Sequence, residues 1–271
     1  MSRERDESGP SKILRFGRDV SGGVVGVGAV VALKEPFVGP PTAVAAQLAL
    51  QRIGEAVSQR WLEPRQAQRV ANAFETAVSL VRAQVQAGAT PRSDWFADHE
   101  QAPEAEEVVE QVLLAARDAG EQRKVPILGR FLANVAFDSG VSAADAHQLV
   151  GLIGRLTYRQ LVMLSVFGTK SLREGDLLRR GADAEAGLVT VSTPLRAELL
   201  EIRDDGLIGV DRGAEYAVAF EDTWDSAEGA VALLTGATIT DHGHKLYRLG
   251  GLQELIADAE TFLDELLPDS R

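Results

Sequence analysis

The stretch Pro126-Ile-Leu-Gly-Arg-Phe-Leu-Ala-Asn-Val135 carries the pattern on which the predicted fold rests. Its apolar residues recur at intervals of three and four positions, which places them on one face of an α-helix. They are Ile127, Leu128, Phe131, Leu132 and Val135. Proline is favoured in the first turn of a helix, where its missing N–H costs no hydrogen bond. The stretch therefore predicts a helix that begins at Pro126 and buries this apolar face.

Two stretches that precede this helix show the same spacing. Pro64 suits the first position of one helix, which is expected to end at Gly88, and a second helix is predicted from Pro103. Their apolar faces consist of Val70, Phe74, Ala77, Val78 and Val81 and of Val108, Val109, Val112, Leu113 and Ala116. Glutamates at positions 104, 106 and 107 match the positive end of the second helix dipole, so we interpret them as stabilising rather than catalytic.

Two polar motifs mark the starts of further helices. Ser142 precedes Asp145 by three positions, and Thr157 precedes Gln160 by three positions. Both pairs resemble capping boxes, in which side chains satisfy backbone N–H groups that a helix start leaves unpaired. Each pair is followed by an apolar helical stripe. These motifs therefore predict two further helices, one through Leu152 and Ile153 and one through Leu164 and Val166.

The last third of the chain combines helices with short strands. A helix, a strand, a turn and a returning strand are predicted in that order, and a final strand and two helices follow. The expected elements are the helix from Thr193-Pro194 to Asp204-Asp205-Gly206, the strand 207–210, the turn Asp211-Arg212-Gly213, the strand with Tyr216, Val218 and Phe220, a possible strand Thr238-Ile239-Thr240, the helix 241–249 and an amphipathic helix from Leu252 to Leu266. This order is typical of a winged-helix-like α+β module.

We divide the chain into three parts on these patterns. Residues 1–19 are expected to form a charge-mixed, disordered tail that is not typical of a signal peptide. Residues 20–155 are expected to form a glycine-rich hairpin and a helical bundle, and residues 156–271 the winged-helix-like domain. The predicted fold class is therefore mainly α.

The predicted hairpin consists of two apolar arms, residues 20–33 and 37–50, on either side of Lys34-Glu35-Pro36. Small residues in the arms would allow close helix packing against protein, or insertion into a membrane. They are Gly22, Gly26, Gly28, Ala32 and Gly39. As a helix, each arm would reach about 21 Å, which is short of the roughly 30 Å hydrocarbon core of a bilayer. Packing against protein is the preferred interpretation, and a membrane hairpin is the alternative.

The composition argues against nucleic acid as a partner. The chain has 28 Lys and Arg residues against 40 Asp and Glu residues, which gives a net charge of −12. Such a surface repels phosphate backbones and anionic lipids. The predicted helix at 194–205, which would read DNA in a winged helix, is itself net acidic. Cysteine is absent, which excludes disulfides and thiolate chemistry and fits a reducing cytoplasm.

Motifs for catalysis or cofactor binding are not recognised. The glycines in Gly23-Val24-Val25-Gly26-Val27-Gly28 do not have the spacing of a dinucleotide-binding or P-loop motif. His242 and His244 are two positions apart, so on a helix they would point in different directions and would chelate one metal poorly. We therefore assign no catalytic, cofactor-binding or metal-binding residue and expect no enzymatic activity.

Several segments resemble a family of mostly uncharacterised bacterial helical proteins that is similar to the abortive-infection alpha proteins of phage defence. The segments are Glu121-Gln-Arg-Lys-Val-Pro-Ile-Leu-Gly-Arg-Phe-Leu-Ala-Asn-Val-Ala-Phe-Asp138, Leu156-Thr-Tyr-Arg-Gln-Leu161, Gly206-Leu207-Ile208 and Thr240-Asp241-His242-Gly243. The resemblance covers about residues 45–255. It implies a helical region followed by a strand and a helix. Where a tighter consensus has a Lys-Lys-Leu-Pro type of sequence, this chain has Val125-Pro126 and keeps only Lys124.

The resemblance establishes no catalytic residues that could be transferred to this chain. Together with the amphipathic helices, it predicts a non-enzymatic protein that oligomerises or binds a protein partner, as a regulator or effector of phage defence. The expected location is the cytoplasm, with membrane association through the hairpin as an alternative. A membrane-acting effector and a winged-helix transcriptional regulator are the two alternative functions.

Overall fold

The computed structural model describes residues 63–92, 103–169, 193–210 and 237–266. Most of these residues are helical, and their β-structure is one pair of short strands, so the expectation of a mainly helical protein is confirmed. The first elements are α2 (Pro64–Gln86), α4 (Pro103–Asp118), the 3-10 turn η1 (Gln122–Lys124), α5 (Val125–Val135), α6 (Ala143–Arg155) and α7 (Tyr158–Gly168). They are followed by α10 (Thr193–Asp204), β1 (Ile208–Val210), β2 (Ala237–Ile239), α13 (Asp241–Leu249), the 3-10 turn η4 (Leu252–Leu255) and α14 (Ile256–Leu266).

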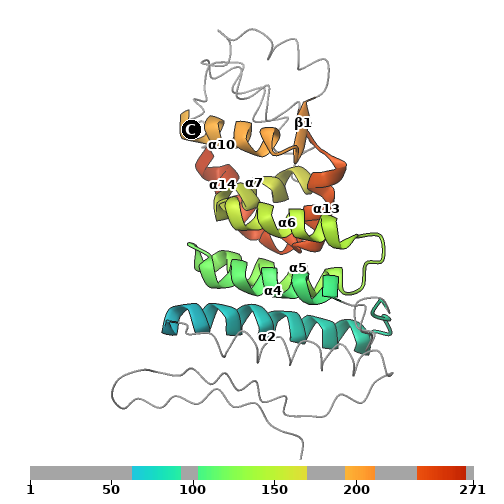
Figure 1. Ribbon diagram of the computed structural model, residues 1–271. Coiled ribbons are helices and arrows are strands. Elements are labelled where there is room, and N and C mark those ends of the chain that lie inside the picture. Colours follow the sequence, from blue (N-terminus) through green and yellow to red (C-terminus); the bar gives the residue numbers. More distant parts are fainter. Residues whose placement is uncertain (1–62, 93–102, 170–192, 211–236, 267–271) are drawn as a thin grey trace, which may run out of the picture.

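Helix α5 packs against α2 and α4 on one side and against α13 on the other. In Figure 1, α2 lies at the bottom, α4 and α5 lie above it, α6, α7 and α13 follow, and α10 and β1 lie at the top. The apolar face predicted for α5 is buried at every position. The helix begins at Val125, one residue before the expected start, so Pro126 occupies its second position, where a missing N–H is equally harmless.

Helices α2 and α5 approach each other closely at Gly129. A Cβ atom at this position would lie 2.5 Å from the backbone oxygen of Ala73 and 2.7 Å from the Cβ of Thr76. Both distances are far below van der Waals contact, so the backbone of α5 rests directly on α2. The glycine costs helix stability in isolation, about 1 kcal/mol relative to alanine. Close packing of the two apolar faces offsets that cost.

Of the two expected capping boxes, one is complete, and at the other only the N-cap hydrogen bond forms. Ser142 accepts a hydrogen bond from the backbone N–H of Asp145 at 3.0 Å, and Thr157 forms a complete capping box with Gln160. After α2, Gly88 adopts a φ angle of +89°, a left-handed conformation that glycine tolerates best. These local interactions explain why the boundaries could be read from the sequence.

Strands β1 and β2 form an antiparallel pair in which Ile208 lies opposite Ile239. The strand expected at residues 216–220 lies outside the described residues. Among the described residues, β1 pairs with β2, which begins one residue before the strand expected at 238–240. The final helix differs from the prediction of one continuous helix from Leu252. It begins with the 3-10 turn η4, which follows Gly251 in a left-handed conformation with φ +63°.

Elements from both sides of position 155 contribute to one buried core. Asn134 on α5 connects them with hydrogen bonds. Its side-chain amide nitrogen donates to the backbone oxygen of Leu249 at 2.9 Å, and its side-chain oxygen accepts from Gln84 at 3.0 Å. Asn134 thereby links α2, α5 and the end of α13, where helix carbonyl groups lack partners within the helix.

We predict that Gly129→Ala lowers the free energy of unfolding by roughly 1–3 kcal/mol, because the new methyl group overlaps the α2 backbone. Gly151→Ala is the matched control: Gly151 is also helical, and a Cβ there meets nothing within 4 Å. It should leave stability unchanged or raise it by up to about 1 kcal/mol. Chemical denaturation of both variants measures the difference, and equal effects would contradict the proposed close contact.

Candidate functional site

The residues singled out for helix packing or membrane insertion lie outside the described part of the chain. These are Gly22, Gly26, Gly28, Ala32 and Gly39. The charge-mixed tail at 1–19 and both arms of the expected hairpin lie there as well. Within the described ranges, no helix is long and apolar enough to cross a bilayer. The candidate site described below therefore comes from a different part of the protein.

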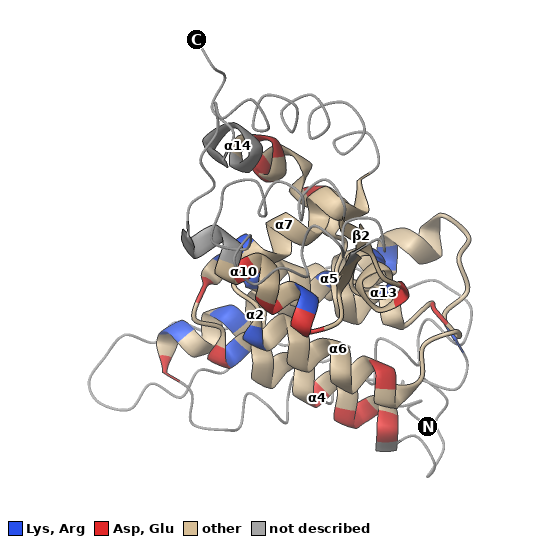
Figure 2. Ribbon diagram, turned by 90° about the horizontal axis from the view of Figure 1, so that it is seen from above, with Lys and Arg blue, Asp and Glu red and all other residues tan. Residues whose placement is uncertain are grey.

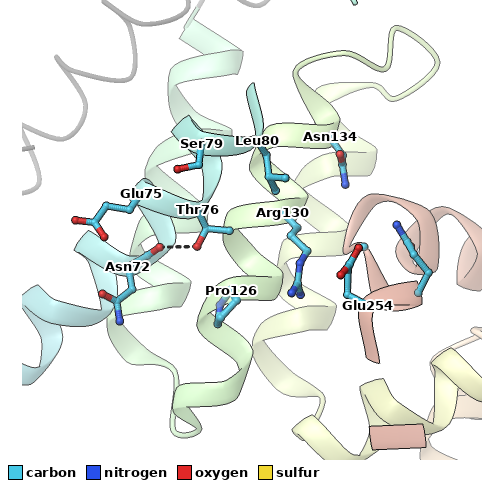
Figure 3. Close-up of a pocket in the computed structure, with 11 residues that line it drawn as sticks. Asn72, Glu75, Thr76, Ser79, Leu80, Pro126, Arg130, Asn134 and Glu254 are labelled. Carbon is cyan, nitrogen blue, oxygen red and sulfur yellow. Dashed lines mark hydrogen bonds between the residues drawn. The ribbon is translucent and has the colours of Figure 1, made fainter. Parts of the chain in front are cut away.

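A groove of about 660 Å³ lies between α2, α5 and the start of η4. Figure 3 shows the side chains that line it, including Glu75, Ser79, Arg130, Asn134 and Glu254. The volume is in the range of ligand-binding sites, which extends from roughly 300 to 1,000 Å³. Unlike an apolar pocket, this groove has a mixed lining of charged, polar and apolar groups.

The helical repeat places these groups together. On α2, the lining positions 72, 75, 76 and 79 are three or four residues apart and thus share one face. On α5, Pro126, Arg130 and Asn134 are four residues apart and form a second row. Because the apolar faces of both helices point into the core, their polar faces meet along the outer side of the same contact. The groove is therefore a direct consequence of the α2–α5 packing.

Some of the polar lining is already used within the fold. Asn134 is occupied by its bonds to Gln84 and to the end of α13. Thr76 donates from its hydroxyl to the backbone oxygen of Asn72 at 2.8 Å, and the Asn72 side-chain oxygen accepts from Gln68 at 2.7 Å. These interactions stabilise helices and their contacts. The charged side chains of the groove are therefore the groups that are available to bind another molecule.

The charged residues of the groove are Glu75, Arg130 and Glu254. In the described part of the chain, none of the three side chains has a hydrogen bond or an ion pair. In Figure 3, Glu75 points to one side of the groove, while Arg130 lies on the other side, next to Glu254. Charges of opposite sign thus line one surface without pairing with each other.

Gly251 supports the position of Arg130. Its φ angle of +63° favours glycine, and a Cβ atom there would lie only 2.7 Å from the Cδ of Arg130. The aliphatic part of the arginine therefore passes over a residue without a side chain. This contact directs the guanidinium along the groove and explains why a glycine follows α13 here.

A second polar cluster joins η1, α7 and α14. The Tyr158 hydroxyl donates a hydrogen bond to Asp258, and the Arg123 guanidinium lies 5.4 Å from the centre of the Tyr158 ring. Glu121 accepts a hydrogen bond from the backbone N–H of Tyr158 at 2.8 Å. Burial, together with the Asp258 carboxylate, raises the pKa of Tyr158 to about 12. The cluster attaches the last helix to the bundle.

Lys124 has a structural position next to this cluster. Its side chain is only 4% exposed, and its Nζ donates to the backbone oxygen of Gly154 at 2.8 Å, near the end of α6. A cation at the C-terminal end of a helix interacts favourably with the helix dipole. Burial lowers the pKa of Lys124, while the charge of Glu121 acts in the opposite direction. Lys124 thus holds η1 against the end of α6.

Acidic side chains of α10, and that of Asp205 directly after it, contact α7 and α6. Glu198 pairs with Arg159 at 2.7 Å. Glu201 accepts from Gln160 at 2.6 Å, and Asp205 pairs with Arg155 at 2.6 Å. The sequence revealed these acidic residues but not their basic and amide partners, which lie about 40 to 50 positions earlier in the chain. These carboxylates connect elements within the protein.

The remaining acidic and histidine clusters do not assemble into a metal site in the described residues. Glutamates 104, 106 and 107 give α4 an acidic end, visible in Figure 2, and are exposed. His244 stacks against the ring of Tyr247, with 6.1 Å between the ring centres. Its contact is therefore with a neighbouring aromatic residue of the same helix.

Comparison with known proteins finds no matching family model, no similar curated protein and no similar solved structure. Sequence reasoning did not identify Glu75, Arg130 or Gly251 as functional residues. The sequence does contain one indication that Arg130 is unusual: it is the only charged residue in the apolar helix from Val125 to Val135.

We predict that Tyr158 makes stability sensitive to alkaline pH. Its pKa is about 12 in the folded protein and near 10 in the unfolded chain, so its contribution is complete below pH 10 and is lost as pH rises through 12. Wild type should exceed Tyr158→Phe in unfolding free energy by about 1.5–3 kcal/mol near pH 9, the range for a hydrogen bond to a charged group. The difference should shrink strongly by about pH 11.5. Denaturant titrations at both pH values test this, and a constant difference would contradict it.

Proposed function

We propose that this protein is a non-enzymatic interaction protein that forms homo-oligomers through its helical faces. The observation that carries this proposal is the surface of α2 and α5, where Glu75 and Arg130 line one groove and form no hydrogen bond or ion pair within the described residues. Unpaired charges on rigid helices are suited to a complementary protein surface. The charged groups of the Tyr158 cluster, of α10 and of Asp205, by contrast, pair with other elements of the fold and are suited to holding it together.

The order of α7, α10, β1, β2 and α13 supports a winged-helix-like arrangement of residues 156–271. In a DNA-binding winged helix, the helix before the first wing strand presents basic or amide side chains to the major groove. In this chain that helix is α10, and its Glu198 and Glu201, with Asp205 directly after it, contact α6 and α7. This arrangement supports a packing or protein-contact role for α10.

The biological setting that we propose is phage defence, as a regulator or effector. It rests on the resemblance of residues 121–138 and 156–161 to helical proteins similar to the abortive-infection alpha family. The structure adds a physical reason why such segments would be shared, because Glu121, Lys124 and Tyr158 join helix ends. An oligomerising protein suits that setting, since a change of assembly can act as the signal.

We predict that the full chain forms a defined oligomer in solution. Size exclusion with light scattering should give a mass that is a multiple of 29.0 kDa and that decreases on dilution or at high salt, because the proposed contacts include exposed charges. The same preparation should not turn over nucleotides or peptides. A monomeric mass at all concentrations, together with such turnover, would rule out the proposed function.

A further inference from the structure

We propose that the groove between α2 and α5 is the contact surface for a second copy of this chain, related by a two-fold axis. The proposal deepens and rests on the proposed function, because it assigns the oligomer contact to a particular surface. In this contact, Glu75 of each copy pairs with Arg130 of the other copy. The same two residues therefore form two identical ion pairs.

The charges of this surface are self-complementary. A two-fold contact brings together two copies of one surface. If residue i of the first copy contacts residue j of the second, then residue j of the first copy also contacts residue i of the second. A surface can bind itself in this way when it carries both signs of charge at separate positions. Glu75 on α2 and Arg130 on α5 meet that condition, because they come from opposite sides of the groove and point apart (Figure 3).

The surface of α2 is also suited to a close approach. Between and beside the two charges, the groove is lined by short side chains such as Thr76 and Ser79, and Leu80 and Pro126 add apolar area. Interfaces that form reversibly have about the same polar character as the rest of a protein surface, so a mixed lining does not oppose association. Glu75 and Ser79 are exposed, so both are accessible to a second copy.

Electrostatics limits the strength of this contact. Each exposed ion pair strengthens the contact by up to about fivefold, and symmetry applies that factor twice. Glu254 lies next to Arg130 and leaves the groove with one more negative than positive charge per copy. The resulting dimer is expected to be reversible and sensitive to salt, and the two charge pairs determine its geometry more than its affinity.

Charge reversal provides the test. In Arg130→Glu, a homodimer would place glutamate opposite Glu75 twice, and in Glu75→Arg it would place arginine opposite Arg130 twice. Each variant alone should dimerise at least about tenfold more weakly than wild type, which corresponds to 1.4 kcal/mol. An equimolar mixture of the two variants should recover the dimer, because a heterodimer restores an acid–base pair at both contacts. Light scattering and sedimentation of the full chains measure this recovery.

Glu106→Arg is the matched control. Glu106 is an exposed glutamate on α4 outside the groove, and its substitution changes the net charge by the same amount as Glu75→Arg. It should leave dimerisation unchanged. Circular dichroism and thermal unfolding establish that each variant is folded. If a reversal variant does not fold, Glu75→Gln and Arg130→Gln remove the charges with little change in shape and should each weaken the dimer about threefold or more.

A single thiol tests the location independently. The chain has no cysteine, so Ser79→Cys introduces one reactive position in the groove. A short bifunctional maleimide should crosslink this variant into covalent dimers, and far less so when Arg130→Glu is also present. The same thiol placed at position 106 should give little crosslinking.

The possible failures are distinguishable. If wild type is an oligomer but the two reversal variants keep its affinity, or their mixture does not recover it, the groove is not the contact and the proposed function stands. If wild type is monomeric at every concentration, both the groove contact and the proposed oligomer are wrong.

Discussion

The direct contact between the backbones of α5 and α2 at Gly129 is the constraint on which the described structure depends. A side chain at this position would overlap Ala73 and Thr76, so the two helices can lie this close only with glycine. The close approach buries the apolar faces of both helices, which is the main favourable contribution to folding. It also brings their outer faces together and forms the groove. One steric condition thus links the stability of the core to the proposed interaction surface.

Polar interactions then connect this helix pair to the rest of the protein. Asn134 joins α2 and α5 to the end of α13. Lys124 joins η1 to α6, and Tyr158 joins α7 to α14. In each case a side chain satisfies a backbone group at a helix end or a second polar side chain, and leaving such groups unpaired would cost roughly 1–3 kcal/mol. Their positions at helix ends explain how separate amphipathic helices are held in one arrangement.

The charged side chains differ in whether they pair within the fold or are available to bind another molecule. The carboxylates of α10 and of Asp205 directly after it would suggest an acidic outer surface if the sequence alone were considered, yet Glu198 and Asp205 pair with arginines of neighbouring helices. Among the residues that the structure describes, Glu75 and Arg130 have no such partners. A charge that remains unpaired on a rigid surface can contribute to recognition without weakening the fold. This contrast is the physical basis for placing the proposed interaction at α2 and α5.

The sequence by itself determined the helices and many of their ends, because these depend on local interactions. The apolar spacing from Ile127 to Val135 identified the buried face of α5, and Thr157 with Gln160 identified the start of α7. The early start of α5 and the 3-10 turn after Gly251 were not predicted, since both depend on small differences in local conformation. Only the tertiary structure decided the groove. Glu75 and Arg130 are 55 positions apart, and nothing in the sequence indicates that they share a surface until the packing at Gly129 brings α2 and α5 together.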